Sequence, residues 1–251
     1  MNLKVISFNI RCVDDANGHT IKERAQRLAI ITQRYDADVM GLQEYTPFWE
    51  QDIDKIIGEE YAFFYKYRAD NGWVESAPIL WKKDKFACIR KGCFWLSDTP
   101  EAMSGGWDEE GHNRICLFVI LQEKETQKTF ALINTHFGFG CENQVKSVRL
   151  MHEYMQKLRP YPVIFTGDFN MIPSSMGYAE MIAKMRDVNE LTVRDRRSTY
   201  HGYAPETDKN AHIDYCFITE DITPISLKII DERADDKFPS DHYGIFAELE
   251  L

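Results

Sequence analysis

One stretch carries more structural information than any other part of the chain: VIFTGDFN, at residues 163–170. Its apolar half, Val163–Phe165, predicts a short buried strand, and Gly167 permits a tight turn where that strand ends. Asp168 and Asn170 follow, and in an extended chain two residues so spaced point to the same side. Because α/β proteins bind ligands at the carboxyl ends of their strands, we expect this acid and this amide to face a site.

Two other places in the chain also join an apolar run to polar groups. The run Val39–Leu42 is followed closely by Glu44, and the pair Asp241–His242 stands just before the run Gly244–Ala247. Carboxylate oxygens are suitable ligands for a hard divalent cation such as Mg²⁺, and an Asp near a His can orient the imidazole. Together these three segments, in which polar groups adjoin an apolar run, predict metal-assisted hydrolysis.

The bulk composition excludes several classes of protein. With 251 residues, 44% hydrophobic and 28% charged, the chain is globular rather than disordered. It is long enough for one large α/β domain spanning residues 1–251. The net charge of −10 lacks the basic footprint of proteins that hold long nucleic acid through many phosphates. Nucleic acid is therefore a second candidate partner that the charge does not favour.

Membrane and secretory proteins are disfavoured as well. No window approaches the ~18 unbroken apolar residues of a membrane span, and Met1–Lys4 runs directly into a strand without the pattern of a signal peptide. The six cysteines stand singly, without the spacing of a zinc site, so we expect buried free thiols. These features predict a cytoplasmic protein.

Apolar periodicity predicts strands that form two sheets and helices that lie outside them. Thr20 and Glu23 have the spacing of a capping box, and the apolar positions after them recur at helical intervals up to Tyr35. The longest irregular stretch, Ser97–Asn113, is functional or mobile by its length, and its Trp107 is available to cover a pocket. Strands are predicted at Leu3–Ile10, Val39–Glu44, Ile79–Trp81, Phe86–Leu96, Ile115–Gln122, Phe130–His136, Val163–Phe165, Ile213–Thr219 and Ile245–Leu251, and helices within residues 21–35, 145–158 and 176–185.

The candidate site residues also have structural interpretations. Glu44 closes a buried strand, where a lone carboxylate is costly. Its charge would be offset by Mg²⁺ or Mn²⁺, or by a neighbouring Arg or Lys. Asp168 and Asn170 together suit water activation and the binding of a phosphate oxygen, but the same spacing is common in an Asx-turn.

His242 requires a partner that fixes its tautomer, and two carboxylates are candidates. Asp214 stands within a predicted strand, between Ile213 and Tyr215, where an acid is hard to explain by structure alone. Asp241 is the neighbour of the histidine in sequence. A histidine with two such carboxylates favours a catalytic role over that of a satisfied core residue.

Three further polar residues flank predicted strands. Asn9 ends the first strand, although Asn there is also a common turn residue. His136 closes the polar cluster after Phe130–Ile133, and Arg114 stands directly before the strand that begins at Ile115. Arginine is the residue type best suited to bidentate binding of phosphate, so Arg114 is a candidate for substrate binding.

In this order, the polar segments resemble those of the endonuclease/exonuclease/phosphatase superfamily, Mg²⁺-dependent phosphoesterases that share a fold with DNase I. The resemblance covers nearly the whole chain. Within the superfamily, the sequence is most similar in pattern to a bacterial branch of metal-dependent hydrolases, which is related to the deadenylase-like members. The resemblance rests on Ser7–Asn9, Leu42–Glu44, Asn134–His136, Gly167–Asn170, Ile213–Tyr215 and Ser240–His242.

The resemblance implies a DNase I-like four-layer α/β sandwich, with two packed mixed β-sheets and outer helices. It also implies that Mg²⁺, or Mn²⁺, is the cofactor and that no covalent intermediate forms. The implied roles are metal binding by Asn9, Glu44 and Asp241, positioning of nucleophile and phosphate by Asp168 and Asn170, phosphate contact by His136, and action of His242, oriented by Asp214, on the attacking water or the transition-state charge.

Three classes of function remain open at this point. The first is a phosphoesterase that hydrolyses a small phosphodiester or phosphomonoester by metal-assisted in-line attack of water. The second is a nuclease, exonucleolytic or deadenylase-like, acting on RNA or DNA. The third is a non-catalytic binding module, which has no need for an intact set of Glu44, Asp168, Asp214 and His242.

Overall fold

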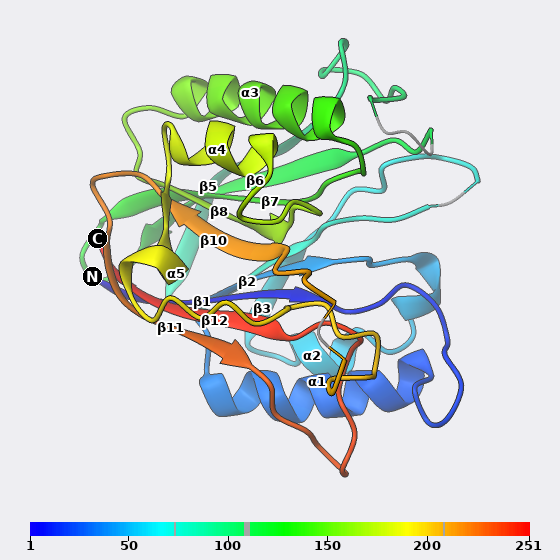
Figure 1. Cartoon of the computed structure of the whole chain (residues 1–251). Helices are drawn as coiled ribbons and strands as arrows, with labels where there is room; N and C mark the ends of the chain where they lie inside the picture. Colours follow the sequence, from blue (N-terminus) through cyan, green and yellow to red (C-terminus); the bar gives the residue numbers. More distant parts are fainter. Residues whose placement is uncertain (73, 108–110, 208) are drawn as a thin grey trace.

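The computed structural model of the protein describes residues 1–72, 74–107, 111–207 and 209–251, and its strands form two mixed β-sheets (Figure 1). The first sheet contains β1 (Asn2–Asn9), β2 (Val39–Gln43), β3 (Tyr61–Phe64), β4 (Ile79–Lys82), β11 (Thr223–Ile230) and β12 (Gly244–Glu250). Their order across the sheet is β11-β12-β1-β2-β4-β3. The second sheet contains β5 (Phe86–Trp95), β6 (Ile115–Glu123), β7 (Thr129–His136), β8 (Val163–Asp168), β9 (Arg186–Asp187) and β10 (Asp214–Ile218), in the order β5-β6-β7-β8-β10-β9.

The helices lie outside the two sheets. Those on the side of the first sheet are α1 (Ile21–Tyr35), the short α2 (Asp54–Ile57) and the 3-10 turn η1 (Pro47–Trp49). The second sheet is covered by α3 (Cys141–Lys157) and α4 (Met176–Ile182), while α5 (Val188–Leu191) lies beside β10 and β11 (Figure 1). The predicted four-layer α/β sandwich is confirmed. That residues 1–251 form one domain stays a prediction.

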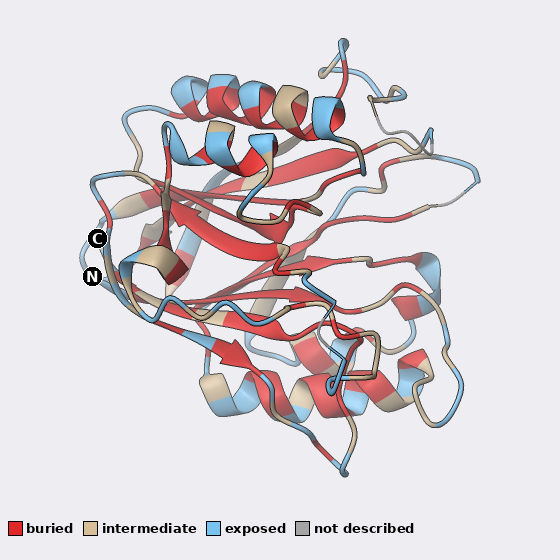
Figure 2. Ribbon diagram, in the orientation of Figure 1, coloured by how far each residue is buried: buried red, intermediate tan, exposed pale blue. Residues whose placement is uncertain are grey.

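Three apolar cores fill the three interfaces between the four layers. Successive side chains of a strand point to opposite faces, so Val5 of β1 enters the core between the sheets while Ile6 enters the core beneath α1. In the same way Leu117 of β6 faces the other sheet and Cys116 faces α3. Figure 2 shows central strands buried along nearly their whole length, which is why their sequences are unbroken apolar runs.

Strand direction brings the polar strand ends to one edge of the sandwich. β1 runs parallel to β2, with α1 between them in the chain, and β7 runs parallel to β8, with α3 between them. β12 is antiparallel to β1, and β10 is antiparallel to β8. The carboxyl ends of the four parallel strands therefore meet the amino ends of β10 and β12.

Several strands have bounds that differ from the prediction, and others were not predicted. β2 ends at Gln43, because Glu44 has a positive φ of 65° that leaves the extended region. β10 begins at Asp214 itself, so this residue is at the start of the strand and not in its middle. The sequence did not predict β3 or β11. β11 is an edge strand with an irregularity between Pro224 and Ser226, which weakens its alternating pattern.

The six cysteines are free, but only three are buried as expected. Cys88 and Cys93 of β5 are half-buried, because this strand is at the edge of the second sheet. Cys141 is exposed at the start of α3, on the solvent-facing side of the first turn. Within the described residues, no helix has the length and apolar character needed to cross a bilayer.

Candidate active site

A pocket of about 580 Å³ opens at the edge where the strand ends meet. Its lining includes most of the site residues chosen from the sequence, namely Glu44, Arg114, His136, Asp168, Asn170, Asp241 and His242. The other two, Asn9 and Asp214, lie behind the lining, where Asn9 hydrogen-bonds Asp168 and Asp214 hydrogen-bonds His242. Residues from both sheets, at the ends of seven strands, therefore converge on one cavity.

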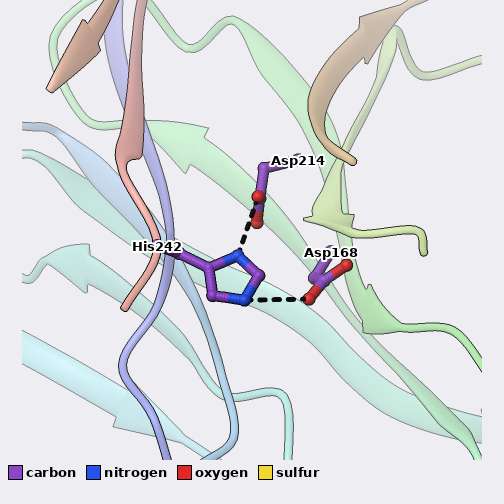
Figure 3. A group of neighbouring side chains, drawn as sticks. All are labelled: Asp168, Asp214 and His242. Atoms are coloured by element: carbon purple, nitrogen blue, oxygen red, sulfur yellow. Dashed lines mark hydrogen bonds and ion pairs between the residues drawn. The ribbon is translucent and has the colours of Figure 1, made fainter. Parts of the chain in front are cut away.

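His242 is held from behind by a carboxylate (Figure 3). Its Nδ1 lies 2.9 Å from Oδ2 of Asp214, and both side chains are buried. Burial opposes the charged imidazolium, but the Asp214, Asp168 and Asp241 carboxylates outweigh this and raise the pKa of His242 to about 10. Of the two candidates for orienting the histidine, Asp214 is the one that contacts its Nδ1.

Asp168, at the end of β8, is the central acid of the pocket. Its Oδ2 lies 3.8 Å from Nε2 of His242 (Figure 3) and 3.6 Å from Nε2 of His136. The same oxygen accepts a hydrogen bond of 3.0 Å from Nδ2 of Asn9. Two imidazoles and one amide from different strands thus converge on a single buried carboxylate oxygen.

Asn170 reaches the pocket by a route other than the predicted one. Its φ is 48°, and its backbone N–H donates to Oδ1 of Asp168, so the two residues form an Asx-turn rather than an extended pair. The expectation that an extended backbone aligns them was wrong. The turn nevertheless places Nδ2 of Asn170 3.2 Å from Nε2 of His136, where it also donates to the carbonyl of Phe137.

Glu44 stands in a left-handed backbone conformation directly after β2. Such a conformation is unfavourable for Glu, and it is maintained where the surroundings fix it. Oε1 accepts a hydrogen bond from Nδ2 of Asn9, and Oε2 accepts one from the backbone N–H of Cys12. These N–H groups hold a half-buried carboxylate that faces the pocket.

The acidic side of the pocket has a composition suited to a divalent cation. Asp241 is buried beside His242, and its carboxyl pKa is raised by burial and by the Glu44 charge, although His242 and Arg11 act in the opposite direction. A cation would relieve this accumulation of negative charge. Asp168, Asp214 and His242 also offer ligand atoms within 4.8 Å of one another, but Asp214 and His242 already bond each other.

Asn9 is not oriented as a ligand in this arrangement. Its Oδ1 accepts the backbone N–H of Arg11, while its Nδ2 donates to the two carboxylates of Glu44 and Asp168. A ligating role would require the amide to turn. In its present orientation Asn9 hydrogen-bonds both carboxylates and so links Glu44 to Asp168.

The sequence did not single out Arg68 and Glu75, which form one wall of the pocket. Both are buried, with Nη1 of Arg68 3.2 Å from Oε2 of Glu75. The same Oε2 lies 3.6 Å from Nδ1 of His136. Burial would raise the carboxyl pKa of Glu75, but His136, Arg68 and Arg114 outweigh it and lower that pKa to about 2. The only sequence signal was a charged pair in an irregular segment, which usually means surface.

The long loop before β6 supplies polar side chains and not the expected cover. Arg114 is buried and lines the pocket as predicted, and His112 joins it. Trp107 does not line the pocket. Its Nε1 donates to Asp98, and its ring packs toward α3, with Nζ of Lys146 5.7 Å away. The expectation that Trp107 covers the pocket was therefore wrong; residues 108–110 of this loop lie outside the described residues.

Comparison with solved structures gives close matches over the whole chain. An endonuclease/exonuclease/phosphatase from Bacteroides vulgatus is 27% identical, with a TM-score of 0.91, covering 100% of this chain and 99% of that one. A mannosyl-6-phosphatase from Bacteroides thetaiotaomicron is also 27% identical, with a TM-score of 0.90 and coverage of 99% and 100%.

Comparison with curated sequences identifies a more distant relative. The 3'-5'-exoribonuclease subunit Ccr4 of the CCR4-Not complex of Saccharomyces cerevisiae is 23% identical over 86% of this chain and 34% of its own length. The family described as Endonuclease/Exonuclease/phosphatase matches residues 6–242, a range that includes every candidate residue of the pocket. The protein therefore belongs to the Endonuclease/Exonuclease/phosphatase family.

Proposed function

We propose that the protein is a Mg²⁺-dependent phosphoesterase that hydrolyses a small phosphate ester by in-line attack of water. The observation that supports this most directly is the convergence of His136 and His242 on one oxygen of Asp168, in a pocket that also contains Glu44 and Asp241. Acid, amide and imidazole groups around one cavity are what hydrolysis of a phosphate ester requires.

The carboxylates of Glu44 and Asp241, with Asp168 close by, would hold Mg²⁺ or Mn²⁺. This donor set fits because such ions prefer oxygen ligands, and because burial and the Glu44 charge raise the pKa of Asp241, a cost that a bound cation would relieve. When bound, the cation would offset the charge of the phosphoryl oxygens and favour attack on phosphorus. Asn9 joins Glu44 to Asp168 and would complete the set if its amide turned.

The protein's own groups divide the remaining work. His242 is fixed through Nδ1 by Asp214, so its Nε2 faces Asp168 and the cavity, where it donates to developing charge on the phosphate. Asp168 orients the attacking water and accepts its proton. Asn170, His136 and Arg114 bind the phosphate oxygens, each from a different segment of the lining.

Two observations favour a small ester as the substrate. The cavity of about 580 Å³ has the size of a small-molecule site, and the chain carries a net charge of −10. The similarity to a mannosyl-6-phosphatase at 27% identity over essentially the whole chain supports the same interpretation. The relationship to Ccr4 keeps nucleases as the alternative. The cytoplasmic location inferred from the sequence stays a prediction.

Turnover of a panel of phosphate esters tests the proposal. The purified protein is assayed with Mg²⁺ against phosphomonoesters, small phosphodiesters, single-stranded RNA and single-stranded DNA. We expect a small ester to give the highest kcat/KM. A polynucleotide as the best substrate would contradict the small-ester proposal and support the nuclease, and no Mg²⁺-dependent turnover of any ester would contradict both.

A further inference from the structure

We infer that the outer part of the pocket recognises a hydroxylated ring as the leaving group, so that the substrate is a sugar-like phosphomonoester. This inference rests on the proposed phosphoesterase function. It assigns the leaving group to two walls of different chemistry, which are separated by the imidazole of His136.

The first wall is apolar and centres on Phe139. This side chain is 46% exposed, yet it lines the pocket that contains the phosphate-binding groups. Its backbone is fixed on both sides, because Asn143 donates to the carbonyl of Phe139 and Asn170 donates to the carbonyl of Phe137. An exposed aromatic ring in the lining that also contains Asn170 offers a flat surface to a substrate whose phosphate is bound there.

Ile213 extends the apolar wall from the residue directly before β10. It lines the same pocket, and its carbonyl accepts the backbone N–H of Phe169, the residue directly before Asn170. The segments that carry Phe139 and Ile213 therefore both contact the chain at residues 169–170. A ring whose phosphate lies on Asn170 would have its C–H face against these two side chains.

The second wall is charged and lies on the other side of His136. Nε2 of His136 faces Asn170, whereas its Nδ1 faces Glu75, which is paired with Arg68. Asn113 donates to the carbonyl of Arg68, and this bond joins the segment of Arg68 to the loop that contributes His112 to the lining. Guanidinium groups donate and carboxylates accept hydrogen bonds, and hydroxyl groups can pair with either.

The two walls together suit a hydroxylated ring better than a nucleobase. A base is commonly stacked between or upon aromatic side chains. In the described part of the lining, the aromatic rings other than histidine are Phe139 and Tyr200, and Tyr200 packs on His242 with ring centroids 5.0 Å apart. Phe139 can therefore contact one face of a ring while its hydroxyl edge meets the charged wall.

The first test compares leaving groups on the unmodified protein with Mg²⁺. The probes are glucose 6-phosphate, its analogues that lack one ring hydroxyl, glycerol 3-phosphate and adenosine 5'-monophosphate. We expect kcat/KM for glucose 6-phosphate to exceed that for glycerol 3-phosphate by about tenfold or more, as a good stacking contact provides. Removing a contacted hydroxyl should cost a further factor of about ten, because its hydrogen bond to a charged side chain is lost.

The second test compares two exposed phenylalanines. Phe139→Ala should lower the ratio of kcat/KM for glucose 6-phosphate over glycerol 3-phosphate about tenfold, while Phe139→Trp should keep the ratio. Phe48→Ala is the matched control, since Phe48 is 69% exposed and is not part of this lining. It should leave both rates unchanged.

The outcomes separate the inference from the function on which it rests. Equal turnover of the ring and acyclic esters, or a ratio unaffected by Phe139→Ala, would overturn the ring site and leave the phosphoesterase intact. A Phe139-dependent preference for adenosine 5'-monophosphate would assign the wall to a base and overturn the sugar-like leaving group. No Mg²⁺-dependent turnover of any probe, glycerol 3-phosphate included, would count against the proposed function itself.

Discussion

Two histidines approach Asp168 from opposite sheets, and the carboxylates behind them are arranged differently. His242, before β12 of the first sheet, has Nδ1 2.9 Å from Asp214, a hydrogen-bond distance between buried groups. His136, at the end of β7 in the second sheet, has Nδ1 3.6 Å from Glu75, which is too long for a hydrogen bond. Their Nε2 atoms lie at similar distances, 3.8 and 3.6 Å, from the same oxygen of Asp168.

The difference lies in what else each carboxylate holds. Asp214 contacts the imidazole of His242, whereas Glu75 also pairs with the guanidinium of Arg68 at 3.2 Å. A carboxylate that is partly neutralised by a cation exerts a weaker field on a third group. We therefore expect His242 to have a fixed tautomer and orientation, with His136 held less firmly and suited to phosphate contact.

Removal of the divalent cation should have the largest effect, because it would make both histidines ineffective. EDTA should abolish turnover, and Mg²⁺ or Mn²⁺ should restore it better than Ca²⁺, since compact octahedral oxygen sites disfavour the larger ion. Glu44→Gln should lose most activity at limiting Mg²⁺ and recover part of it at high Mg²⁺. Full turnover in excess chelator, or wild-type turnover of Glu44→Gln at limiting Mg²⁺, would remove the metal from the proposal.

The His242 pair should show the next largest effect. Asp214→Asn should lower kcat on the order of 10²-fold and His242→Ala at least as much, as expected for a general acid–base group and the residue that orients it. Because the two act as one unit, the double variant should be scarcely worse than His242→Ala alone. Fully multiplicative losses in folded, metal-bound proteins would mean that Asp214 and His242 act independently.

Substitution of Glu75 should lower turnover less than substitution of Asp214. This prediction tests the comparison of the two histidine–carboxylate pairs most directly. Glu75→Gln keeps the shape of the side chain but removes its charge, and we expect kcat/KM to fall by roughly tenfold, about 1.4 kcal/mol. Asp214→Asn, measured under the same conditions, is the matched variant. If Glu75→Gln costs as much as Asp214→Asn, the two pairs are equivalent and the difference in Nδ1 distance has no functional meaning.

The two histidine–carboxylate pairs could not be predicted equally well from the sequence, because their residues lie in different kinds of segment. Asp168, Asp214 and His242 are each at or near the end of a strand whose apolar residues are readable, so local pattern placed them at one edge. The two-sheet sandwich was predictable for the same reason, since strands buried on both faces leave long apolar runs.

Glu75 and Arg68 could not be found in this way. They stand in the irregular segment between β3 and β4, where Trp95 and Asn113 hold the carbonyl of Arg68. Those bonds join residues distant in sequence and leave no local pattern. From the sequence, an Asx-turn at Asn170 is an alternative to a functional role, whereas in the structure Asn170 both forms the turn and lines the pocket.

A third histidine provides a control whose ring hydrogen-bonds no carboxylate of the described residues, and its effect should be on stability and not on turnover. His152 of α3 is buried, and within the described residues its two ring nitrogens have no hydrogen-bond partner. Burial and the Lys184 charge outweigh the opposing Glu180 carboxylate and lower the pKa of His152 to about 4, in contrast to the raised pKa of His242.

The sign of the pH effect follows from this lowered pKa. The folded protein keeps His152 neutral between pH 6.5 and 4, while the unfolded chain takes up a proton, so stability is complete above pH 6.5 and is lost as the pH falls toward 4. From pH 7 to 5 this group alone should lower the free energy of unfolding by about 2 kcal/mol.

Urea unfolding of the wild type and of His152→Met at both pH values measures this loss of stability. Met fills the site without titrating, so the variant should lose less stability on acidification and keep near-wild-type kcat. An unchanged pH slope would show that burial without a hydrogen-bonded carboxylate does not hold this histidine neutral, and the contrast with His242 would then lose its physical basis.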